Sequence, residues 1–126
     1  MTSRRGGPTV RTCNVEDVPV VEVGAGVRQR VLAGGSRSDG SPLLVGVTTV
    51  EAHRTSRSIE HDTAELAYVL SGSGWMVTDV AEHPFRPGDS ILIDARCWHA
   101  IRAGDTAVEM VYVFPSPDVP PTRQRL

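Results

Sequence analysis

This chain is a series of short β-type runs separated by turn signals, and no part of it has the pattern of a long helix. No stretch of a dozen residues sustains the helical spacing of apolar side chains. The runs are mostly rich in valine, isoleucine, threonine or aromatic residues. They cover residues 18–23, 27–33, 43–51, 65–72, 75–80, 90–95, 98–103 and 107–114. Many short strands at near-regular spacing predict an all-β protein, either a sandwich or a barrel.

The turn signals between these runs are rich in glycine, proline, serine and aspartate. They read GAG, AGGSRSDGSP, SGSG, DVAEHP, RPGD and AGD. We therefore expect the segment DVAEHP, like the others, to be a bend rather than a strand.

The length of 126 residues fits one compact domain. Residues 1–14 are polar and contain glycine and proline, which predicts a flexible N-terminal arm. Residues 116–126 are rich in proline and predict an extended tail that cannot enter the interior of a sheet. The barrel itself is expected over residues 15–115.

Composition excludes several classes of function. All 13 basic residues are arginines, so no Schiff-base lysine and no P-loop lysine exists. The net charge of −2 gives no electrostatic footprint for nucleic acid. No apolar run approaches the roughly 18 residues that span a membrane, and the first residues lack the apolar core of a signal peptide. We therefore expect a cytoplasmic protein.

The two cysteines, Cys13 and Cys97, are far apart and form no CxxC motif. Without a secretory signal we expect both to be reduced thiols. A disulfide between them is the alternative.

Polar side chains stand where this pattern predicts buried strands. In the stretch SIEHDTAELAYVLSGSG, His61 and Glu65 directly precede an apolar run. While that segment stays extended, His61, Thr63 and Glu65 share one face. In CWHAIRA, the same alternation puts His99 on one face between Cys97 and Ile101. A buried carboxylate costs several kcal/mol unless it is bound or hydrogen-bonded, so these polar groups favour a site over a plain core.

The first of these stretches resembles a known motif. HDTAELAYVLSG is similar to the second half of the first cupin motif, in which a His-x-His pair precedes a glutamate that is followed by a glycine. His61, Glu65 and Gly72 match its spacing.

The stretch PGDSILIDARCWH resembles the second cupin motif. Its Gly, Pro, Gly and His would fall on Gly88, Asp94, Arg96 and His99, so the internal proline and glycine are replaced here. The resemblance covers residues 43–114 and is to small single-domain bacterial cupins. It implies a cupin-type, RmlC-like jelly-roll β-barrel in a single domain.

The sequence departs from the first motif at Ile59, which stands where the family has its first histidine. The ligand set that the resemblance then implies is His61, Glu65 and His99. Two histidines and one carboxylate leave open positions on a divalent metal, which suits Fe, with Mn, Ni or Zn as alternatives. A metal-free site, in which a histidine acts as a general base, is the other hypothesis.

Two further side chains are candidates for the site. His53 could replace the missing ligand if the loop that leads to Ile59 folds back. Cys97 is in phase with His99 and could line the same pocket, although a small buried hydrophobic role is the simpler interpretation. His83, beside Pro84, is expected at the surface.

The resemblance implies a small-molecule enzyme whose catalytic residues are His61, Glu65 and His99. The reaction would be a metal-assisted isomerisation, cyclisation or dehydration of a carbonyl- or carboxylate-bearing metabolite in a biosynthetic pathway. The alternatives are an Fe(II)-dependent cupin dioxygenase and a non-catalytic ligand-binding cupin. The expected partners are a small-molecule substrate and a second copy of the chain, with residues 18–23 crossing to the partner's sheet.

Overall fold

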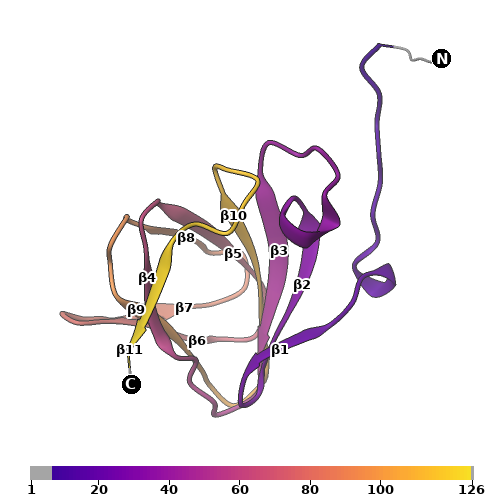
Figure 1. Ribbon diagram of the computed structural model, residues 1–126. Helices are drawn as coiled ribbons and strands as arrows, with labels where there is room; N and C mark the ends of the chain where they lie inside the picture. Colours follow the sequence, from indigo (N-terminus) through magenta and orange to yellow (C-terminus); the bar gives the residue numbers. More distant parts are fainter. Residues whose placement is uncertain (1–6, 126) are drawn as a thin grey trace.

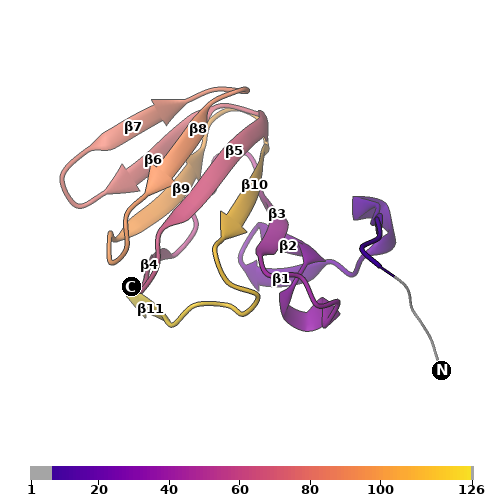
Figure 2. The same cartoon turned by 90° about the horizontal axis from the view of Figure 1, so that it is seen from above.

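The computed structural model describes residues 7–125, which form two antiparallel sheets that face each other (Figures 1 and 2). One sheet has six strands in the order β1-β2-β3-β10-β5-β8, and the other has five in the order β11-β4-β9-β6-β7. The strands are β1 (Val21–Gly24), β2 (Val27–Ala33), β3 (Leu44–Val50), β4 (Ser58–His61), β5 (Glu65–Ser71), β6 (Gly74–Thr78), β7 (Glu82–Phe85), β8 (Ser90–Ile93), β9 (His99–Ala103), β10 (Val108–Phe114) and β11 (Thr122–Arg125). Two short 3-10 helices, η1 (Val15–Asp17) and η2 (Gly35–Arg37), complete the described part. The prediction of an all-β fold is confirmed.

Each of the eight predicted runs overlaps a strand, and β2 coincides with its run. β7 lies partly where the sequence predicted only a bend. Its Pro84 has no amide proton to donate, and β7 tolerates this because it lies at the edge of its sheet.

The prediction for the C-terminal residues is wrong in one respect, because they include a strand. β11 pairs in antiparallel fashion with β4 at the edge of the five-stranded sheet, so the barrel extends beyond the expected limit of residue 115. Arg123 forms ion pairs with Glu60 and Asp62, and the guanidinium of Arg125 lies 4.3 Å from the ring centroid of Trp98. These contacts hold the strand without needing an apolar face on it.

Of the expected N-terminal arm, residues 1–6 lie outside the described part, and residues 7–14 lie outside both sheets (Figure 1). The chain then returns to the barrel. Arg30 donates a hydrogen bond to the carbonyl oxygen of Val15, and Val18 is buried. β1 pairs with β2 of the same chain, so a crossing of residues 18–23 to a partner stays a prediction.

The apolar core fills the space between the two sheets. Val50, Val69 and Val108 have no exposed surface, and they belong to a cluster that includes side chains from both sheets. Two members of this cluster, Met76 and Met110, also line the cavity described below. The core therefore forms part of the wall of the site.

The turn after β5 depends on Gly72, the glycine that ends the first motif. Its φ of 79° is a left-handed conformation, and a Cβ there would collide with the carbonyl oxygen of Ala107.

Both cysteines are free, Cys13 being exposed and Cys97 partly buried. Within residues 7–125, no helix has the length and apolar character that crossing a membrane requires.

Candidate metal centre

The three candidate ligands come from three strands in two sheets. His61 ends β4 and His99 begins β9 in the five-stranded sheet, whereas Glu65 begins β5 in the six-stranded sheet. The chain bends at residues 62–63 and crosses between the sheets. The expectation that His61, Thr63 and Glu65 follow one extended strand is therefore wrong. His61 and Glu65 instead meet across the interior.

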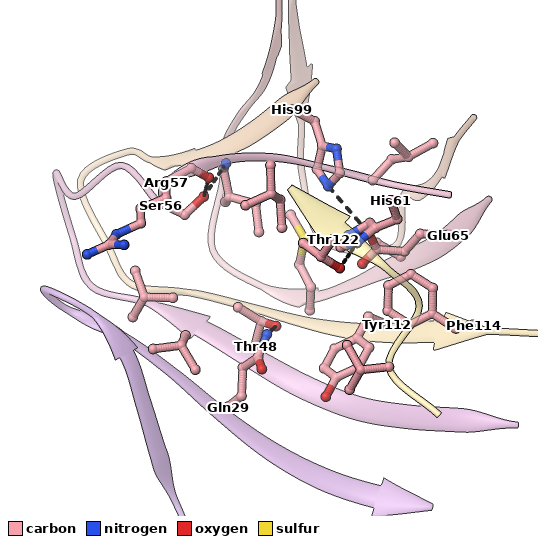
Figure 3. A pocket seen from close by; sticks show the side chains of 18 of the residues that line it. Gln29, Thr48, Ser56, Arg57, His61, Glu65, His99, Tyr112, Phe114 and Thr122 are labelled. Carbon is pink, nitrogen blue, oxygen red and sulfur yellow. Dashed lines mark hydrogen bonds and ion pairs between the residues drawn. The ribbon is translucent and has the colours of Figure 1, made fainter. Parts of the chain in front are cut away.

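The structure brings the three side chains into one cluster (Figure 3). Glu65 Oε1 lies 3.3 Å from His61 Nε2 and 3.4 Å from His99 Nε2. All three candidate ligand atoms lie within 4.8 Å of one another. The side chains are 7%, 14% and 6% exposed for His61, Glu65 and His99, so the cluster is almost shielded from bulk water.

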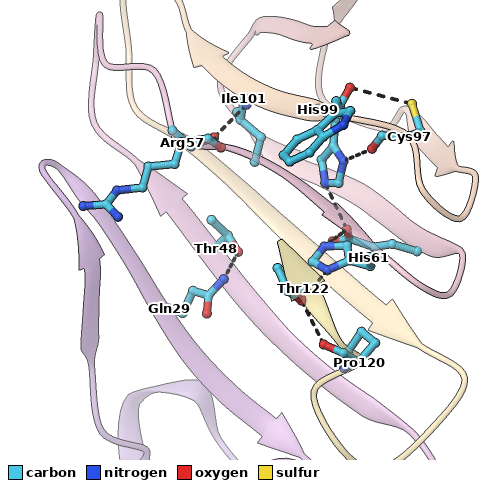
Figure 4. Close-up of polar contacts among 12 residues, drawn as sticks. Gln29, Thr48, Arg57, His61, Cys97, His99, Ile101, Pro120 and Thr122 are labelled. Atoms are coloured by element: carbon cyan, nitrogen blue, oxygen red, sulfur yellow. Dashed lines mark hydrogen bonds and ion pairs between the residues drawn. The ribbon is translucent and has the colours of Figure 1, made fainter. Parts of the chain in front are cut away.

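A hydrogen-bond chain sets the proton position on His61. The Thr122 hydroxyl donates to the carbonyl oxygen of Pro120 over 2.8 Å. Its only proton is then in use, so Thr122 Oγ1 accepts from His61 Nδ1, which is 2.7 Å away (Figure 4). With the proton on Nδ1, the neutral imidazole presents a lone pair on Nε2, toward Glu65.

His99 is held in the same way by the backbone. Its Nδ1 lies 2.8 Å from the carbonyl oxygen of Cys97, which can only accept. Nδ1 therefore carries the proton, and Nε2 is again the atom that faces Glu65. Such contacts on the remote ring nitrogen are typical of histidines that bind metals.

The arrangement requires a positive charge between its members. Two Nε2 lone pairs and the carboxylate oxygen Glu65 Oε1 converge, and Oε1 is buried without a hydrogen-bond donor among the described residues. Either a proton on an imidazole or a metal ion can relieve this repulsion. Ligands at about 2.1 Å from an ion lie roughly 3.0 Å apart at right angles and roughly 3.4 Å apart in a tetrahedron. Both separations between Glu65 Oε1 and an Nε2 atom lie in this range, so the cluster could hold a divalent metal.

The same contacts shift two pKa values. Burial raises the pKa of Glu65, but interactions with His61 and His99 outweigh it and lower the pKa from 4.5. Burial lowers the pKa of His99, yet the contact with Glu65 and the hydrogen bond to Cys97 raise it above 6.5 overall. Without metal, the pair therefore favours a carboxylate beside an imidazolium.

The cluster opens onto a cavity of about 350 Å³ between the sheets (Figure 3). Most of its wall is apolar and includes Val27, Leu44, Ile59, Ala67, Met76, Ile93, Ile101, Met110 and Phe114. Its polar wall residues are Gln29, Thr48, Ser56, Arg57, Tyr112, Thr122 and Gln124. Burial and the charge of Glu65 raise the pKa of Tyr112 to about 12, so its phenol stays protonated.

Both departures from the motifs have a structural counterpart. Ile59 lines the cavity and lies opposite His99 in the pairing of β4 with β9, so an apolar side chain stands beside the cluster. Arg96 adopts the left-handed conformation, with a φ of 61°, at the position where the second motif has a glycine. Its backbone N–H donates to the carbonyl oxygen of His61 over 2.7 Å, which ties this turn to the end of β4.

The two additional candidates lie outside the cluster. The side chain of His53 is 72% exposed and its Nε2 lies 4.0 Å from Asp105 Oδ1, so it does not replace the missing ligand. Cys97 contributes its backbone carbonyl to His99, while its side chain packs against the core. It lines a second cavity, of about 390 Å³, that also contacts His99. His83 is exposed, as predicted.

Thr122 is the residue of this centre that the sequence did not reveal. It lies 61 residues after His61, in a segment whose composition predicts a tail. All four residues of β11 are exposed, so no apolar alternation marks the strand. Only the fold brings this hydroxyl to the imidazole.

Comparison with known proteins identifies the fold. A family model for the cupin domain, Cupin_2, matches residues 46–114. The polyketide cyclase RemF from Streptomyces resistomycificus superimposes with a TM-score of 0.78 at 19% identity, over 94% of this chain and 87% of that one. Rru_A2000 from Rhodospirillum rubrum, described as a cupin-2 domain, gives 0.77 at 19% identity over 98% and 85%. Ectoine synthase from P. lautus gives 0.74 at 19% identity over 93% and 91%.

No curated protein sequence matches the chain significantly. At these identities the structural likenesses establish the fold alone. The family match covers more than half of the chain, and it includes the three clustered residues and both motifs. The chain therefore belongs to the cupin family and has its jelly-roll fold.

Proposed function

We propose that this cupin is a metal-dependent enzyme whose centre consists of His61, Glu65 and His99. The observation that carries the proposal is the convergence of both Nε2 atoms on one buried carboxylate oxygen, with each Nδ1 already engaged elsewhere. The substrate would be a small carbonyl- or carboxylate-bearing metabolite that enters the cavity of about 350 Å³. The reaction would be an isomerisation, a cyclisation or a dehydration.

A divalent ion held by these residues would supply a Lewis acid that polarises a carbonyl group. Once both imidazoles serve as ligands, the remaining basic atom of the cluster is the second carboxylate oxygen, Glu65 Oε2. We assign to it the transfer of a proton from the carbon next to the carbonyl. Tyr112 keeps its proton at neutral pH, so it can donate a hydrogen bond but cannot act as the base. The apolar wall excludes water and thereby strengthens both interactions.

The names of several structural neighbours support this class of chemistry. A polyketide cyclase and an ectoine synthase are among them, which favours a ring closure for this chain. Another neighbour, the oxalate decarboxylase of Bacillus subtilis, has Mn(II) centres. Its TM-score with this chain is 0.73 at 16% identity, over 87% of this chain and 30% of that one.

A metal-free acid–base enzyme is the second candidate, and the directions of the two pKa shifts favour it. An imidazolium at His99 beside a carboxylate at Glu65 would satisfy the cluster without an ion. The imidazolium would then donate a proton and the carboxylate would accept one.

Removing and restoring the metal tests the proposal. We expect chelator-treated protein to lose turnover of carbonyl compounds and to regain it with Zn²⁺ or Mn²⁺, with and without oxygen. Glu65→Gln should abolish turnover. The control Glu82→Gln alters a surface carboxylate that pairs with Arg102, and it should leave turnover unchanged. Activity that survives removal of the metal would favour the metal-free candidate. Activity that needs oxygen would indicate an Fe(II) dioxygenase, and binding without turnover a non-catalytic cupin.

A further inference from the structure

A second polar group lies in the cavity wall that belongs to the six-stranded sheet. Gln29 on β2 and Thr48 on β3 are register partners and point into the cavity (Figures 3 and 4). Gln29 Nε2 donates to Thr48 Oγ1 over 3.3 Å. Thr48 is only 8% exposed, so bulk water does not satisfy its hydroxyl.

This pair has hydrogen-bonding capacity left over. The one hydrogen bond uses Gln29 Nε2 and Thr48 Oγ1. Within residues 7–125, the proton of the Thr48 hydroxyl and the amide oxygen Gln29 Oε1 have no hydrogen-bond partner. One donor and one acceptor therefore face the cavity. A flipped amide would leave the same balance, because Thr48 would then donate to the amide oxygen and the amide N–H would be free.

The surroundings of the pair carry no positive charge. Val27 lies two residues before Gln29 on the same face of β2, and Met110 pairs with Thr48 in the register of β10 with β3; both are apolar and line the cavity. Arg57 lines the cavity as well, but its guanidinium donates to Gln124 Oε1 over 2.8 Å and points away from the pair (Figure 3). An anion at Gln29 and Thr48 would lose its hydration without gaining a counter-charge, which is costly. A neutral group avoids this cost.

We infer that Gln29 and Thr48 form a recognition site for a hydroxyl group at the end of the substrate remote from the histidines. A hydroxyl both donates and accepts, which matches the free acceptor and donor of the pair. This inference rests on the proposed function, and it narrows the substrate to carbonyl or carboxylate compounds whose remote end is largely apolar and carries a neutral hydroxyl group. Discrimination by such a site arises because a compound without the hydroxyl leaves the buried Thr48 hydroxyl and the partly buried Gln29 amide without a partner.

Calorimetric titration with naphthalene probes tests the inference without turnover. We expect the parent protein to bind 1,5-dihydroxynaphthalene about tenfold more tightly than 1-naphthol, of which about twofold comes from the symmetry of the probe. Gln29→Leu and Thr48→Val, which keep the side-chain volumes, should each reduce the ratio to about two. As a control, Thr49→Val removes a hydroxyl from the opposite face of the same strand, β3, and should keep the tenfold ratio.

A parent protein that does not distinguish the two neutral probes would overturn the inference, as would a ratio that both variants retain. Metal content and the thermal unfolding of each variant are measured on the same samples. Metal binding without discrimination rejects this recognition site and leaves the metal centre standing. Discrimination without metal binding supports the recognition site and rejects the metal centre.

Discussion

Replacement of Thr122 by valine should weaken metal binding although Thr122 is not a ligand. Valine keeps the shape of the side chain but removes the acceptor that lies 2.7 Å from His61 Nδ1. The imidazole is 7% exposed, so water is a poor substitute for that acceptor. In the variant, the proton is better placed on Nε2, where it can bond to Glu65 3.3 Å away. That tautomer must be reversed before Nε2 can bind a metal.

The expected loss follows from the hydrogen bond that is removed. Leaving a buried donor without its partner costs about 1–3 kcal/mol. The metal-free variant bears part of the same cost, and only the remainder weakens metal binding. We therefore expect the free energy of metal binding to fall by about 1.4–2.7 kcal/mol. It corresponds to a reduction in affinity of about 10- to 100-fold, the usual range for groups that orient a ligand.

Competition with a chromophoric chelator measures the affinity of the parent and its variants for Co²⁺. Thr122→Ser keeps the hydroxyl and should bind the ion within about threefold of the parent. Thr106→Val, an exposed site in the turn before β10, controls for a general effect of threonine loss. Equal affinity in Thr122→Val and Thr122→Ser, with both folded, would refute the role of the hydroxyl.

Three further predictions concern the ligand set, pH and assembly. Ile59→His should raise Co²⁺ affinity at least tenfold by adding a fourth ligand, and unchanged affinity would show that this position does not reach the ion. In metal-free protein, the contribution of Glu65 to stability is present above pH 4.5 and is lost as the pH falls through its lowered pKa. That of His99 is present below pH 6.5 and is lost as the pH rises through its raised pKa. Zn²⁺ binds the neutral imidazole, so the rise in the protein's melting temperature on adding Zn²⁺ should be larger at pH 8 than at pH 6. Calorimetry that shows the reverse would contradict this. Tyr68 and Leu92 are 47% and 69% exposed on the outer face of the six-stranded sheet, so we propose that this face joins two copies. Light scattering should give the mass of a dimer for the parent and of a monomer for Tyr68→Glu, and a monomeric parent would exclude the proposal.

The sequence predicted the strands whose composition differs from that of their surroundings. β5 and β10 are strongly apolar and bordered by turn residues, so both were evident. β7 and β11 were not, because one contains proline and the other consists only of exposed polar residues. Edge strands of this kind are stabilised by backbone pairing and ion pairs, which leave no apolar pattern.

The candidate site was predicted in its members but not in its geometry. His61, Glu65 and His99 stood out because each interrupts a segment that otherwise suits a core. The crossing between sheets after His61 was missed, since HDTAEL contains neither glycine nor proline. The hydrogen bond from Thr122 could not be foreseen at all, because it depends on a pairing between strands 61 residues apart.

Elemental analysis of the purified protein after incubation with a divalent metal is the direct test of the metal centre. We expect one equivalent of metal per chain in the parent, and almost none in His61→Ala and His99→Ala that keep the circular dichroism of the parent. A folded parent that retains no metal, or folded alanine variants that retain a full equivalent, would contradict it.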